Sequence, residues 1–105
     1  MNLYENIPDP QPEEQVDLLL NRPQCRVERI VSWGQTTPSN AWYDQEEEEW
    51  IVLLQGEASL LIEKDGAVEE VRLTRGDLLV LEKNQRHRVT YTSADPPCIW
   101  LCWFL

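Results

Sequence analysis

The chain has 105 residues, of which 42% are hydrophobic, and a formal net charge of −10 at pH 7. This length is typical of one domain, and the hydrophobic content is enough for a packed core, which argues against wholesale disorder. A surface this acidic repels phosphates, so neither nucleic acid nor an anionic membrane surface is expected as a partner.

Residues 1–23 are polar and rich in proline, and we expect them to lead into the main domain, residues 24–105. The first five residues lack the basic start of a secretory signal peptide. Pro12 to Leu20 predicts a short helix, because proline suits a first helical position and two glutamates follow it. Val16, Leu19 and Leu20 would share one face of that helix, which we expect to flank the main domain.

From residue 24 onward, short apolar runs alternate with turn sequences. The clearest turn is Lys64-Asp65-Gly66, because an Asp-Gly pair between apolar runs favours a β-hairpin. Many short strands separated by turns are typical of a β-sandwich or barrel. The predicted strands are Cys25–Ser32, Trp50–Gln55, Ala58–Glu63, Val68–Leu73, Leu78–Leu81, His87–Thr92 and Cys98–Phe104.

Two of these strands are apolar on both faces. Side chains alternate along a strand, so one face fills the interior while the other must also leave water. An exposed apolar patch of that size is unusual on a monomer, and twofold pairing is the common solution, so we expect a homodimer. The outward residues are Trp50, Val52 and Leu54 on one strand and Ile99, Leu101 and Trp103 on the other.

The three cysteines do not have the spacing of a disulfide framework. Cys98 and Cys102 fall on one strand face, roughly 13 Å apart at the usual rise per residue, which is too far for a disulfide. Together with Cys25 they predict three reduced thiols and a cytoplasmic location.

Two spaced motifs resemble those of the cupin superfamily. Glu49 followed by Gly56 is similar to the second half of the first cupin motif. Gly76-Asp77, with His87 ten residues after the aspartate, is similar to the second motif. The resemblance covers roughly residues 25–104. It implies an all-β fold, an antiparallel jelly-roll (cupin) barrel, here as a small single domain with the short N-terminal helix added.

The metal-binding part of this pattern is degenerate. In the family, two histidines one residue apart precede the motif glutamate. Counted back from Glu49, those positions fall on Trp42 and Asp44, or on Tyr43 and Gln45 if the loop is one residue shorter. The chain has a single histidine, so neither choice supplies the pair.

Strand alternation places Glu49 and His87 on inward faces of two different strands, with Asp44 just upstream. These three residues are the candidate metal ligands, and such a set can hold Zn, Mn, Fe or Ni and act as a Lewis acid. The same side chains can equally line a pocket without any cofactor.

Aromatic residues near the predicted barrel mouth suggest how a ligand would be held. Trp42 is the candidate for stacking on the ligand, with Tyr91 opposite, and Tyr43 and Gln45 complete the expected pocket. The other four tryptophans are expected in the core or at an interface.

The residues leave three functions open. The missing histidines favour a small cupin that binds a small-molecule ligand in its interior pocket without efficient catalysis. The alternative is a metal-dependent enzyme of the oxygenase or isomerase class that uses Asp44, Glu49 and His87. The third is a structural dimerisation domain. Fold alone does not decide between them, because one fold hosts many functions.

Overall fold

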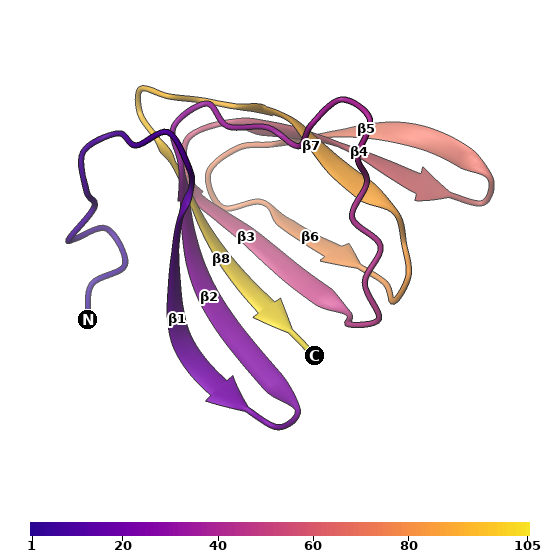
Figure 1. Ribbon diagram of the computed structural model, residues 1–105, viewed down its shortest axis with the longest axis horizontal. Coiled ribbons are helices and arrows are strands. Elements are labelled where there is room, and N and C mark those ends of the chain that lie inside the picture. Colours follow the sequence, from indigo (N-terminus) through magenta and orange to yellow (C-terminus); the bar gives the residue numbers. More distant parts are fainter.

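The structure, a computed structural model, describes residues 1–105 and consists of two antiparallel β-sheets (Figure 1). The larger sheet has the strand order β1-β2-β8-β3-β6, and the smaller has the order β5-β4-β7. The chain forms no helix, and therefore none that could span a membrane. The strands are β1 (Gln15–Arg22), β2 (Cys25–Ser32), β3 (Glu49–Gln55), β4 (Ala58–Lys64), β5 (Ala67–Leu73), β6 (Leu78–Leu81), β7 (His87–Thr92) and β8 (Cys98–Phe104).

The all-β antiparallel fold is confirmed, and all seven predicted strands are present to within one residue at each end. The hairpin between β4 and β5 shows why. Asp65 has φ 52° and Gly66 has φ 79°, the positive values that a tight two-residue hairpin turn requires. On β4, Ala58, Leu60 and Ile62 are buried while the residues between them are not, which is the alternation of a strand covered on one face.

The predicted N-terminal helix is wrong, because this segment forms the edge strand β1. Its backbone pairs with β2 from Gln15 to Arg22, so long-range hydrogen bonds override the local helical signals. A bulge between Leu18 and Leu20 breaks the alternation of apolar residues. That extra residue produced the helix-like spacing of Val16, Leu19 and Leu20 in the sequence.

The hydrophobic core lies where the inner faces of the two sheets meet. Ile51 and Leu53 of β3 are packed with Leu60 and Ile62 of β4, and all four are at least nine-tenths buried. This packing closes one part of the interior, and the remainder of the inner face is the site described below. The other members of the core cluster are Ala58, Leu73, Leu81, Cys98, Trp100, Cys102 and Phe104.

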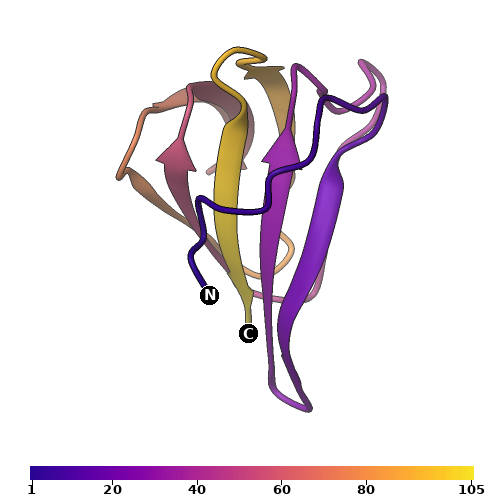
Figure 2. The ribbon, with the colours of Figure 1, turned by 90° about the vertical axis from the view of Figure 1, so that its left-hand side faces the viewer.

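The outer face of the large sheet is partly covered by the N-terminal segment, which crosses β2 and β8 (Figure 2). Arg29 of β2 points to this face yet is only 3% exposed. Its guanidinium forms an ion pair with Asp17 of β1, with 2.6 Å between Nη2 and Oδ2. It also donates to the carbonyls of Leu3 and Glu5. A buried charge that is paired and hydrogen-bonded in this way fixes the segment in place.

Candidate functional site

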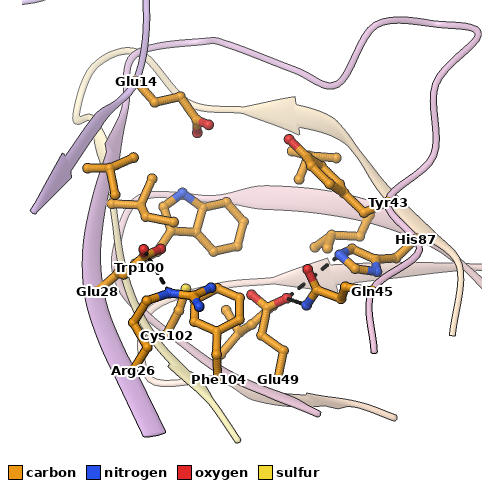
Figure 3. A pocket seen from close by; sticks show the side chains of 15 residues that line it. Glu14, Arg26, Glu28, Tyr43, Gln45, Glu49, His87, Trp100, Cys102 and Phe104 are labelled. Atoms are coloured by element: carbon orange, nitrogen blue, oxygen red, sulfur yellow. Dashed lines mark hydrogen bonds and ion pairs between the residues drawn. The ribbon is translucent and has the colours of Figure 1, made fainter. Parts of the chain in front are cut away.

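A cavity of about 280 Å³ lies on the inner face of the large sheet (Figure 3). Strands β2, β3 and β8 supply its floor, the smaller sheet supplies Leu60, His87 and Val89, and the loop before β3 supplies Tyr43 and Gln45. Nine of its 15 lining residues are hydrophobic. A mainly apolar cavity with a few convergent polar groups is the usual form of a small-molecule site.

Glu49 is the first residue of β3 and is only 6% exposed. Its backbone pairs with Leu81 on one side and Phe104 on the other, so strand alternation turns its carboxyl group into the cavity. The amide of Gln45 donates to Oε1 of Glu49 over 2.8 Å. Burial raises the pKa of Glu49 to about 7, although Gln45 and the Cys102 thiol act against it.

His87, the first residue of β7, lies beside Glu49 in the cavity wall and is 5% exposed. Its backbone pairs with that of Tyr43, whose ring stacks on the imidazole at 5.3 Å between centroids. Nδ1 lies 3.1 Å from the Gln85 carbonyl, which only accepts hydrogen bonds, so Nδ1 carries the proton. The lone pair of Nε2 therefore points into the cavity, 3.8 Å from Oε1 of Glu49. Burial lowers the pKa of His87 and keeps the ring neutral.

An arginine lies in the opposite wall, but its charge is already neutralised. Nε of Arg26 donates to Glu28 over 3.1 Å, and its two terminal nitrogens donate to Glu47 at 3.1 and 3.3 Å. The guanidinium also lies 4.1 Å above the ring of Phe104. This cation is therefore paired with two carboxylates and stacked on a ring, although its side chain remains partly exposed.

The cavity mouth carries a second carboxylate. Glu14, just before β1, accepts a hydrogen bond of 2.6 Å from the hydroxyl of Ser32. The same hydroxyl accepts the indole N–H of Trp100 at 3.1 Å. Figure 3 shows the Glu14 carboxylate at the top of the cavity, on the side of the indole that carries its nitrogen.

Four of the residues singled out in the sequence line the cavity: Tyr43, Gln45, Glu49 and His87. The backbone bridge between Tyr43 and His87 sets the alternation of the loop. Tyr43 and Gln45 consequently point inward at the positions where the family pattern has its two histidines, which is the shorter of the two loop alternatives.

The other three candidates are not among the lining residues. Trp42 points away, with the guanidiniums of Arg86 and Arg88 5.0 and 5.8 Å from its ring centroid. Asp44 is exposed and accepts a hydrogen bond from Asn84 instead of joining Glu49. Tyr91 is 50% exposed on β7.

Arg26, Glu28 and Trp100 are among the residues of the cavity wall that the sequence analysis did not assign to the site. A signal was present for each. Arg26 and Glu28 have the same parity as Ile30 on their strand, and Trp100 has the same parity as Cys98 and Cys102 on β8. Charged residues on the inward face of a buried strand point to a polar interior, because an interior charge must be paired.

The residues that converge here do not fit a transition metal. Nowhere in the structure do three His, Cys, Asp or Glu side chains come together at metal-binding distance. Of the possible ligands in the cavity, His87 lies 3.8 Å from Glu49, while Glu28 is paired with Arg26 and Glu14 accepts from Ser32. The Gln45 amide directs an N–H at the Glu49 carboxylate. A transition-metal site needs at least three protein ligands with deprotonated donors, and the raised pKa of Glu49 works against this.

Comparison with solved structures identifies a similar protein of Ralstonia eutropha JMP134, provisionally named a mannose-6-phosphate isomerase. The two are 35% identical with a TM-score of 0.90, over 99% of this chain and 94% of that one. A cupin superfamily protein of Desulfitobacterium hafniense DCB-2 is 14% identical with a TM-score of 0.76, over 94% and 83% of the two chains.

A third structure, the oxalate decarboxylase of Bacillus subtilis with its Mn(II) centres, shares the fold. It is 17% identical with a TM-score of 0.65, and the match covers 77% of this chain and 21% of the decarboxylase. No curated protein matches the sequence. The family model described as "Cupin domain" matches residues 31–104. Since that match spans most of the chain, the protein belongs to the cupin family.

Proposed function

We propose that this protein binds a small polar molecule in its interior cavity and does so without a resident metal. The observation that carries the proposal is the half-open cavity of about 280 Å³ with Glu49 and His87 close together in its wall. An apolar wall with a few fixed polar groups supports binding of one oriented ligand. The incomplete donor set argues against chemistry that depends on a Lewis acid.

The name of the Ralstonia protein raises the question of a sugar phosphate as ligand. A phosphate group needs a cation or several free N–H donors. Arg26 is the only arginine or lysine lining the cavity, and it is already paired with Glu28 and Glu47. We therefore propose that mannose 6-phosphate is not the ligand.

The proposal is tested by filling the cavity. Val89 lines it, and Val89→Phe would place a ring in the space a ligand needs. Val68 is 53% exposed on β5 and does not line the cavity, so Val68→Phe is the matched control. We expect a small-molecule fragment that binds the wild type and Val68→Phe to fail to bind Val89→Phe, as measured by ¹H–¹⁵N NMR titration. Equal binding to all three proteins would contradict the cavity as the site.

A metal-dependent enzyme of the oxygenase or isomerase class is the competing function. It predicts about one bound metal per chain, with His87 as the only nitrogen ligand. Metal analysis and titration of the wild type and His87→Ala distinguish the two. We expect weak binding that is the same in both proteins, whereas tight binding abolished by His87→Ala would establish the enzyme alternative.

We further propose that the protein is a homodimer in the cytoplasm. Support for the dimer comes from an apolar groove of about 360 Å³ on the outer face of the large sheet. All five residues that line it are hydrophobic: Trp50, Val52, Leu78, Trp103 and Leu105. Support for the location comes from three cysteines that remain free thiols.

A further inference from the structure

The polar groups that face the cavity are predominantly hydrogen-bond acceptors. Nε2 of His87 presents a lone pair on a side chain that is 95% buried (5% exposed), and no hydrogen-bond donor lies within reach of it. The carboxylates of Glu49, Glu28 and Glu14 line the same space. Nε2 opens onto the cavity, so a ligand that supplies N–H groups could donate to it beside the Glu49 carboxyl group.

The charge around the cavity is negative. Three glutamates line it, and the single arginine is shared between Glu28 and Glu47, the latter outside the cavity. His87 does not add a positive charge, because burial favours its neutral form. An anion entering this space would find no free cation, whereas a cation would find carboxylates at its centre and mouth.

Aromatic rings form much of the remaining wall. The rings of Trp100, Phe104 and Tyr43 all line the cavity. The guanidinium carbon of Arg26 lies 4.1 Å from the centroid of the Phe104 ring, so one of these rings already binds a cation. Aromatic faces attract cations through their quadrupole and repel anions. Carboxylates combined with aromatic faces are the combination that recognises an organic ammonium group.

We propose that the cavity selects a compact primary ammonium compound, with the ammonium group beside Glu49 and His87, donating to both, and its hydrocarbon part against Trp100. This inference rests on the proposed binding function and specifies its ligand class. A primary ammonium group offers three N–H donors, enough to serve both the carboxylate and Nε2. The size of the cavity favours a ring or short chain over a polymer or nucleotide.

Three probes that share a cyclohexyl ring test the inference: cyclohexylamine, cyclohexanol and cyclohexanecarboxylate. They are titrated by ¹H–¹⁵N NMR at about pH 8, above the pKa of about 7 for Glu49. We expect the amine to bind at least about tenfold more tightly than the alcohol, as hydrogen bonds to charged groups allow. The carboxylate should not bind. The indole N–H of Trp100 should report the binding, because it lies in the cavity wall.

Glu49→Gln and Glu46→Gln provide the matched variants. Both remove one carboxylate from the same segment, but Glu46 is exposed and does not line the cavity. Glu49→Gln should weaken the binding of the amine about tenfold and leave the affinity for the alcohol unchanged. Glu46→Gln should change neither affinity. Equal affinity for amine and alcohol, or preference for the carboxylate, would overturn the ammonium inference and leave the binding function standing. No binding by any probe would count against both.

Discussion

Burial shifts the two titratable residues that face each other in the cavity in opposite directions. The pKa of Glu49 rises to about 7 and that of His87 falls, so each shift favours the uncharged form. Both effects arise because charge is costly in a space walled mainly by apolar side chains. A ligand with N–H donors offsets this cost, and without such a ligand the cost lowers the free energy of unfolding.

Glu49 should therefore make the folded state less stable as the pH rises. Its pKa is about 7 when folded against an ordinary value of 4.5, so the folded protein binds the extra proton. The contribution to stability is complete below about pH 4.5 and is lost as the pH rises to about 7, a difference of about 3 kcal/mol at most. Glu49→Gln should match the wild type near pH 4.5 and be more stable at pH 8, as measured by urea denaturation.

Stability has to be compared between the wild type and Glu49→Gln at each pH, because His87 changes the pH dependence of stability in the opposite direction to Glu49. Its lowered pKa makes the folded state more stable as the pH rises towards 6.5. The two contributions have opposite signs, so a gain in stability of Glu49→Gln over the wild type at high pH reports the loss of the Glu49 carboxylate. Glu46→Gln should show no such pH-dependent gain, and an equal gain in both variants would mean that general surface charge is responsible.

The site could be predicted only in part from individual residues. Strand alternation turned Glu49 and His87 inward, as expected, because both begin their strands and lie away from the register shifts further along β3 and β7. Alternation could not decide between Asp44 and Gln45, since the loop before β3 has no periodicity of its own. The backbone bridge from Tyr43 to His87 turns Gln45 inward and leaves Asp44 outside. That contact joins residues more than forty positions apart in the sequence.

At the scale of the elements, the two motif glycines mark the ends of strands for different reasons. Gly56, after β3, has φ 88°, and a Cβ there would lie 2.7 Å from the hydroxyl of Ser93 and 3.0 Å from Cys98. Gly76, before β6, has φ 89° with nothing within 4 Å. The first position therefore excludes a side chain by both conformation and space, the second by conformation alone.

Gly76→Ala should cost about 1–2 kcal/mol, the usual penalty for an unfavourable positive φ. Gly56→Ala should cost a further 1–3 kcal/mol or so, because the new methyl group must displace packed atoms. Urea denaturation of the two variants gives the comparison directly. Equal losses would show that Ser93 and Cys98 move aside freely, contrary to the close packing described here.

The element boundaries were predictable where a segment carries its own turn chemistry, as at Asp65-Gly66. The N-terminal strand was not, because Pro12, the following glutamates and the bulge near Leu19 all imitate a helix start. What makes this segment a strand is the free edge of β2, together with the Arg29–Asp17 ion pair. The strand edge and the ion pair exist only in the folded chain, so the sequence of the segment itself does not reveal them.

At the scale of the whole molecule, the outer face of the large sheet is divided between two environments. The N-terminal segment covers the part around Arg29, where carbonyls and Asp17 satisfy the guanidinium. The part formed by β3, β6 and the end of β8 has no such cover and is apolar. Trp50 is 39% and Leu78 is 52% exposed there. In a chain with net charge −10, such a patch differs sharply from the rest of the surface.

A second copy of the chain, related by a twofold axis, would bury this patch against itself. Leu78→Glu places a charge within it and should convert the dimer to a monomer. Val68 is equally exposed, at 53% against 52%, but lies on β5 in the other sheet, so Val68→Glu should leave the dimer intact. Sedimentation at tens of micromolar, an order-of-magnitude choice for a stable dimer, measures all three proteins. A monomeric wild type would contradict the dimer, and dissociation by Val68→Glu would place the interface on the smaller sheet instead.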